Sequence, residues 1–133
     1  MAESLDELRV AVAVEIFGWR AVDWYPPSPI DGWKRLAGIP PYRADQYVTR
    51  LTEMQYGGEE VPDFPRDWTA LGSLLERMRE LGWVYELSSG MAGTFAMFRN
   101  YTGARGTATA PTLPEAAARA ALEAVRAENG VAR

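Results

Sequence analysis

The first regular pattern in the chain is a run of apolar residues at helical spacing. Its members are Leu5, Leu8, Val12 and Ile16. Ser4 precedes the run, and Glu7 lies three residues further on, which is the spacing of a capping box in which each side chain binds the other residue's backbone amide. Residues 10–14 also alternate as a strand would, but the cap and the length favour a helix. We predict a helix over residues 4–17 that ends at Gly18.

A second helical stripe lies near the middle of the chain. Its apolar positions are Leu71, Leu74, Leu75, Met78 and Leu81. Asp67 precedes the stripe, where a carboxylate can accept from the free amides of a first helical turn. Gly82 follows it, as glycines that end helices do. We predict a helix over residues 67–81 with this stripe in the core.

The pattern then changes to two extended runs, at residues 83–87 and 94–99. The glycine-rich segment 88–93 joins them, and this combination predicts a β-hairpin. Residues 106–109 supply a candidate third strand. Hairpin strands form an antiparallel sheet.

An alanine-rich helix is predicted over residues 113–128, ended by Gly130. Thr112 and Glu115 have capping-box spacing, and Pro114 lies in the first turn, where its missing amide hydrogen costs nothing. Because alanine side chains are small, we expect this helix to approach a sheet or another helix closely.

The segment between the first two helices has no clear period. Residues 19–24 can form a short strand, but residues 25–67 hold seven of the nine prolines and six of the fifteen aromatic residues. Helix and sheet interiors exclude proline, because it lacks an amide hydrogen and fixes its own φ angle. Structureless loops of this length are uncommon, and residues 44–56 are the best candidate for a short helix or an extended segment.

These elements fit a single domain over residues 1–133, with a proline- and aromatic-rich insertion at about residues 25–64. The order is α-β-(long insertion)-α-β-β-(β)-α, which is an α+β fold. Three helices cannot all share one face of so small a sheet. We therefore predict a three-layer α/β/α sandwich with a small antiparallel sheet.

Three segments resemble the phage ABA-sandwich family of small phage and prophage proteins. VAVEIFGW at residues 12–19 is similar to the family's VAEKVMGW opening, PRDWTAL at 65–71 with LERM at 75–78 is similar to its middle helix, and ATAPTLPEA at 108–116 with RAAL at 119–122 resembles its closing helix. Residues 25–62 are not covered, and Arg66 replaces the usual small hydroxyl residue. The resemblance implies helix–sheet–helix layering and a phage origin, and it brings no activity and no catalytic residues.

Composition narrows the chemistry. The chain has no cysteine and no histidine, which removes thiolate catalysis, the Ser-His-Asp arrangement and the usual ligands of zinc and other transition metals. No phosphate-loop or dinucleotide fingerprint is present, and the carboxylates show no EF-hand spacing. We predict a protein that is not an enzyme and that uses no cofactor and no metal.

Charge and hydropathy restrict the partners. The formal net charge is −4 and lysine occurs once, at Lys34, whereas binding to duplex nucleic acid relies on basic patches. The residues that open the chain lack the pattern of a secretory signal, and no window is long and apolar enough to span a membrane. We predict a cytoplasmic protein with no duplex nucleic acid or membrane partner, and a place in the virion stays open.

The first candidate site is a set of aromatic residues in and near the insertion: Trp24, Tyr25, Trp33, Tyr42, Tyr47 and Tyr56. Trp and Tyr are enriched at interfaces because they offer a large contact area at low entropic cost. They could equally fold back as a satellite core beneath the insertion. These two interpretations carry equal weight, with a small-molecule pocket behind both.

The second candidate site is basic. Arg99 and Arg105 lie beside glycines 103 and 106, ahead of a helix start near Thr112. Guanidinium groups and helix N-terminal amides both favour anions, so these three residues form a candidate anion site. A turn between a hairpin and a helix also needs glycine for backbone reasons alone, which is the favoured interpretation.

The leading functional hypothesis is a phage or prophage accessory protein that acts through protein–protein contacts as a homo-oligomer. The alternative is an anti-defence protein that sequesters a small ligand or a nucleotide signal. A minor virion component is a third hypothesis.

Overall fold

The computed structural model describes residues 3–25, 35–41 and 59–130. The helices are α1 (Leu5–Ala11), which continues as the π-helix η1 (Val12–Ile16), α2 (Trp68–Glu80) and α3 (Leu113–Glu128). The strands are β1 (Arg20–Tyr25), β2 (Arg35–Ile39), β3 (Glu59–Glu60), β4 (Val84–Gly90), β5 (Gly93–Arg99) and β6 (Arg105–Ala110). They form two antiparallel sheets, in the orders β1-β2-β3 and β4-β5-β6. The predicted α+β class, with its small antiparallel sheet, is confirmed.

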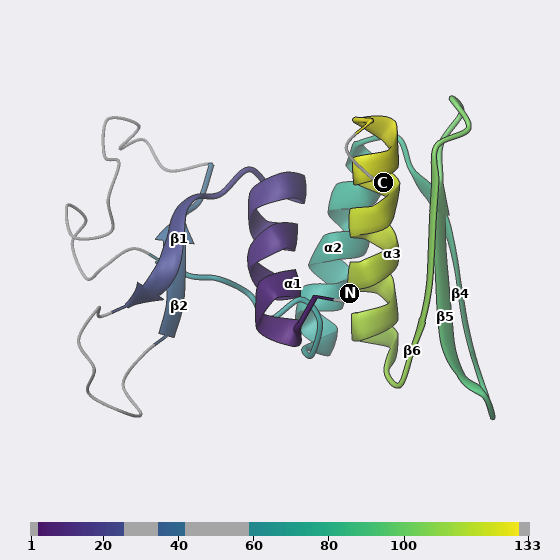
Figure 1. Cartoon of the computed structure of the whole chain (residues 1–133), viewed down its shortest axis with the longest axis horizontal. Coiled ribbons are helices and arrows are strands. Elements are labelled where there is room, and N and C mark those ends of the chain that lie inside the picture. Colours follow the sequence, from purple (N-terminus) through teal and green to yellow (C-terminus); the bar gives the residue numbers. More distant parts are fainter. Residues whose placement is uncertain (1–2, 26–34, 42–58, 131–133) are drawn as a thin grey trace.

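The helices lie between the two sheets (Figure 1). α3 packs on one face of β4-β5-β6, and no described segment covers the other face. The predicted three-layer α/β/α sandwich is therefore not confirmed. One reason is that β2 and β3, which lie in the predicted insertion, pair with β1 into a second sheet.

The N-terminal helix spans the predicted residues, but its second half is a π-helix. The Ser4 amide donates to Glu7 Oε1 at 2.8 Å, and the Glu7 amide donates to Ser4 Oγ at 3.1 Å, which completes the capping box. The Phe17 amide donates to the carbonyl of Val12 at 3.3 Å. The chain then leaves the helix through Gly18, whose φ of 80° is left-handed.

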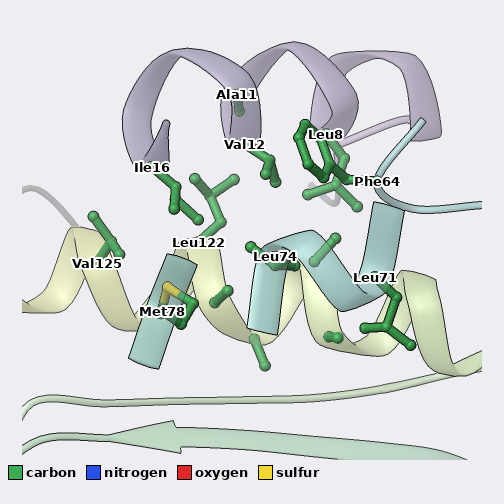
Figure 2. Packing of buried hydrophobic residues seen from close by; sticks show 14 of the residues in the cluster. Leu8, Ala11, Val12, Ile16, Phe64, Leu71, Leu74, Met78, Leu122 and Val125 are labelled. Carbon is green, nitrogen blue, oxygen red and sulfur yellow. The ribbon is translucent and has the colours of Figure 1, made fainter. Parts of the chain in front are cut away.

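The main core lies where the three helices meet, as Figure 2 shows. It includes Leu8, Val12 and Ile16 from the first helix, Leu71, Leu74 and Met78 from α2, and Leu122 and Val125 from α3. Leu81, the last residue of the predicted α2 stripe, is 45% exposed. It forms the C-cap of α2 rather than part of the helical face.

α3 approaches the sheet as closely as its alanines predicted. Its buried residues include Ala116, Ala117, Ala118, Ala120, Ala121 and Ala124. Opposite them on β6 lies Gly106, where an added Cβ would collide with the Ala120 carbonyl oxygen and the Ala124 amide nitrogen. Small residues on both elements therefore set the distance between helix and sheet.

Arginines tie α1 and η1 to later parts of the chain. Arg126 on α3 binds the carboxylates of Glu3 and Glu15, at 3.1 Å and 2.7 Å, and hydrogen bonds with Glu15 and then Glu3 raise its pKa. The buried Arg9 donates to the carbonyl of Val61. Polar contacts thus fix the orientation of a helix that apolar packing holds in place.

The sheet β1-β2-β3 begins with an irregularity. β1 confirms the strand predicted near residues 19–24, and its register with β2 shifts between Arg20 and Asp23. Ala21 lies at this bulge with a φ of 53°, a left-handed conformation that is strained for a residue with a Cβ. The helix or extended segment predicted for residues 44–56 lies outside the described residues.

Candidate functional site

Alternation along the strands assigns the side chains of β4-β5-β6 to two faces. Gly106 contacts α3, so its neighbours along β6 point away from the helix. The register extends this assignment across the sheet. The outward residues are Val84, Glu86 and Ser88 on β4, Phe95, Met97 and Arg99 on β5, and Arg105, Thr107 and Thr109 on β6. We call this surface the outer face; it has an apolar centre and a basic end.

Arg99 and Arg105 form that basic end. They are direct cross-strand partners, and both are exposed. The amide of Asn100 donates to the carbonyl of Ala104 at 3.1 Å, so the adjacent pair, Arg99 with Arg105, is of the non-hydrogen-bonded type, in which Cα atoms are about 4.5 Å apart. Neither guanidinium has an ion pair or hydrogen bond within the described part of the chain. Two like charges this close destabilise the sheet.

Thr112 does not join the two arginines. Arg105 begins β6, whereas Thr112 follows the far end of that strand and caps α3, where its Oγ1 accepts from the Glu115 amide at 3.4 Å. At about 3.4 Å per strand residue, the two ends of β6 are roughly 17 Å apart. The Glu115 carboxylate binds Arg119 at 2.9 Å. The structure thus brings together two of the three residues of the predicted anion site.

The predicted aromatic site is described only at its beginning. Trp24 lies on β1 opposite Leu36 and is 39% exposed. Tyr25 ends the same strand opposite Arg35, so this part of the proline-rich stretch is strand rather than loop. The Tyr25 side chain and residues Trp33, Tyr42, Tyr47 and Tyr56 lie outside what the structure describes.

The free edge of β4 is a candidate binding feature that the sequence patterns did not indicate. Antiparallel pairing alternates, and the Arg99–Arg105 pair is not hydrogen-bonded, so the backbone groups of Arg99 face β4 and bind Val84. The same alternation leaves the N–H and C=O groups of Tyr85, Leu87 and Ser89 on the free side of β4. Within the described residues no strand pairs with this side.

The two edges of the sheet differ. At β6, the carboxylate of Glu123 on α3 accepts from the Thr107 amide at 3.0 Å and so occupies part of that edge. β4 is seven residues long, pairs with β5 without a bulge, and contains neither proline nor lysine. Bulges, prolines and lysines are features that commonly protect an edge strand from pairing with another chain, and β4 has none of them. The predicted hairpin was the signal that could have identified this edge.

Other chemistry is sparse in the described residues. No group of three or more Asp or Glu side chains there is placed to hold a metal ion. In the same part of the chain, every helix is too short or too polar to cross a membrane.

No family model, curated protein sequence or solved structure matches this chain. The resemblance to the phage ABA-sandwich family therefore stays a prediction, as does the phage origin that it implies.

Proposed function

We propose that the protein is a non-enzymatic binding protein that acts through protein–protein contacts and forms a homo-oligomer by pairing its β4 edges. The observation that carries this proposal is the free side of β4, where the backbone groups of Tyr85, Leu87 and Ser89 have no partner strand among the described residues. Edge strands bind other chains by adding a strand to the sheet, with backbone hydrogen bonds supplying the contacts.

A second copy fits this edge in an antiparallel, two-fold arrangement centred on Leu87. Leu87 then faces Leu87 of the second copy, and Tyr85 faces Ser89, which gives about six backbone hydrogen bonds. Glu86, the only charged residue of β4, faces Ser88 rather than another carboxylate. Such a two-fold interface is self-complementary. It would join two sheets into one of six strands, with both α3 helices on the same side.

The oligomeric state tests this proposal. We expect size-exclusion chromatography with light scattering to give a dimer for the native chain. Ser89→Pro removes an outward N–H without removing a hydrogen bond to β5, and it should yield a folded monomer. Ser89→Ala keeps the amide and should remain dimeric. A native chain that is monomeric at every concentration contradicts the proposal, and a dimeric Ser89→Pro variant places the interface elsewhere.

The phage or prophage accessory role is part of the proposal and rests on the resemblance alone. Genomic neighbourhood tests it: genes for early phage functions favour an accessory role in the host cytoplasm, and morphogenesis genes favour a virion component. Mass spectrometry of purified particles distinguishes these two outcomes.

A second candidate function, sequestering a nucleotide-like ligand, is supported by the Arg99–Arg105 pair. The two positive charges face each other across the strands, and neither forms an ion pair with a carboxylate among the described residues. A bound phosphate would therefore reduce their repulsion. Ligands that bind the native state raise its melting temperature. Nucleoside monophosphates should stabilise the native chain and leave an Arg99→Gln/Arg105→Gln variant unchanged. Equal shifts for both proteins would argue against this function.

A further inference from the structure

An open hollow of about 860 Å³ lies beside the end of η1 and the exposed side of α2. Its apolar lining comes from Phe17, Pro41 and Gly72, and its polar lining includes Glu76, Arg77 and Glu80. This volume falls within the range of about 300–1,000 Å³ that is typical of small-molecule sites. The hollow is separate from both the outer face and the β4 edge.

Gly72 has no packing explanation. It lies inside the 13-residue helix α2, where glycine weakens a helix relative to alanine. A Cβ added at Gly72 would have no neighbouring atom within 4 Å. A larger side chain at this position would project into open space beside Phe17 and Pro41. The glycine therefore keeps the hollow open at a cost to the helix.

The opposite wall is held in place by contacts within the protein. The Phe17 ring stacks on Phe64, with centroids 4.8 Å apart. The Arg77 Nε donates to the carbonyl of Ile16, the last residue of η1, at 3.1 Å. These contacts fix the end of η1 against α2, so the hollow is preformed. Short π-helical segments such as η1 frequently accompany functional sites.

The charges around the hollow favour a cation. Arg77 is already engaged by Ile16 and, at 3.7 Å, by Glu80. Glu76 is exposed and has no ion pair or hydrogen bond with a described residue. Glu76 and Glu80 are four residues apart on the helix, where like charges repel. Among the described residues, the charge left unpaired beside the apolar lining is thus negative.

We propose that this hollow binds a small molecule with a ring-sized apolar body and an amine, the body against Phe17 and over Gly72 and the amine at Glu76. Apolar burial would provide attraction for the body, and the carboxylate would select the charge. The site does not depend on self-association through β4.

Three matched probes test the proposal: 2-phenylethylamine, neutral 2-phenylethanol and anionic 3-phenylpropionate. In a titration followed by amide chemical shifts, we expect 2-phenylethylamine to shift resonances around Phe17 and Gly72 and to bind several-fold more tightly than the other two. Glu76→Gln should remove that preference. If no probe shifts these resonances, or if the anion binds as tightly as the amine, the proposal is wrong.

Filling the hollow gives a second test. Gly72→Leu should abolish amine binding while raising the melting temperature, because leucine is a better helix former. Gly72→Ala, which adds only a methyl group, should raise the melting temperature and retain part of the binding. Undiminished binding by Gly72→Leu would overturn the assignment. Light scattering on the same samples keeps this result separate from the β4 proposal, because neither variant touches that edge.

Discussion

Arg99 and Arg105 lie directly opposite each other on β5 and β6, and both point to the outer face. Like charges at directly opposed positions destabilise a sheet, and opposite charges stabilise it by about 0.2–1 kcal/mol. We predict that Arg105→Glu raises the free energy of unfolding by about this amount. Urea denaturation measures the change.

The control for that prediction keeps the charge. Arg105→Lys retains a cation opposite Arg99 and should leave stability close to that of the native chain. Added salt should reduce the difference in the free energy of unfolding between the native chain and Arg105→Glu, because ions screen exposed charges. A gap of the same size at high salt would mean that packing, and not repulsion, is responsible.

Gly106 sets the distance between β6 and α3. Because a Cβ there meets backbone atoms of α3, which cannot rotate away, Gly106→Ala must displace the helix. Overpacking of this kind typically costs about 1–3 kcal/mol, and we expect the upper part of that range in thermal or urea unfolding. Gly90→Ala is the control: its added Cβ has no neighbour within 4 Å, and its stability should stay within about 0.5 kcal/mol of the native value.

Ala21 holds a left-handed conformation, with a φ of 53°. Strain at this position costs about 1–2 kcal/mol. Glycine relieves the strain but lowers stability by about 0.4–1 kcal/mol, because it increases the conformational entropy of the unfolded chain. Ala21→Gly should therefore be neutral or stabilise the protein by up to about 1.6 kcal/mol. Ala92→Gly, in the β4–β5 turn at an ordinary φ, should only lose stability. Equal losses for both variants would show that position 21 is unstrained.

Arg126 joins α3 to both Glu3 and Glu15. Its side chain is 29% exposed, so solvent screens the two ion pairs only in part. We expect Arg126→Gln to cost about 1–2 kcal/mol, and a double-mutant cycle with Glu15→Gln to show positive coupling. Arg79→Gln, at an exposed position on α2 without an ion pair to a described residue, should change stability by less than about 0.5 kcal/mol. No coupling in the cycle would contradict the prediction.

Local signals in the sequence were enough to place the helices. Ser4 and Asp67 accept from the amides that their positions predicted, because a capping residue acts within its own helical turn. The hairpin was also found, although its strands extend to Gly90 and from Gly93, further into the glycine-rich segment than predicted. The glycines indicated the position of the turn, but the pairing of β4 with β5 continues through Gly90 and Gly93.

Features set by distant pairs were not accessible in the same way. β2 pairs with β3 through Ala37 and Glu60, and no local period announces a two-residue strand. The π-helix also escaped prediction, because its residues keep the apolar spacing of an α-helix. The three-residue anion site failed for a related reason: Arg105 and Thr112 are near in sequence, but the strand between them holds them apart.

The arginine contacts of α1 also determine when this helix can reach its native position during synthesis of the chain. Arg9 can form its hydrogen bond only after Val61 has been synthesised. Glu3 and Glu15 can form their ion pairs only after Arg126 has been synthesised, more than a hundred residues later. The β4–β5 hairpin, by contrast, pairs residues that are close to one another in the chain. As the chain leaves the ribosome, the first helix to be synthesised is thus among the last to complete its contacts, and part of its apolar stripe stays exposed until α3 has been made. A nascent-chain series with increasing C-terminal length would show α1 protected from protease only once Arg126 has emerged.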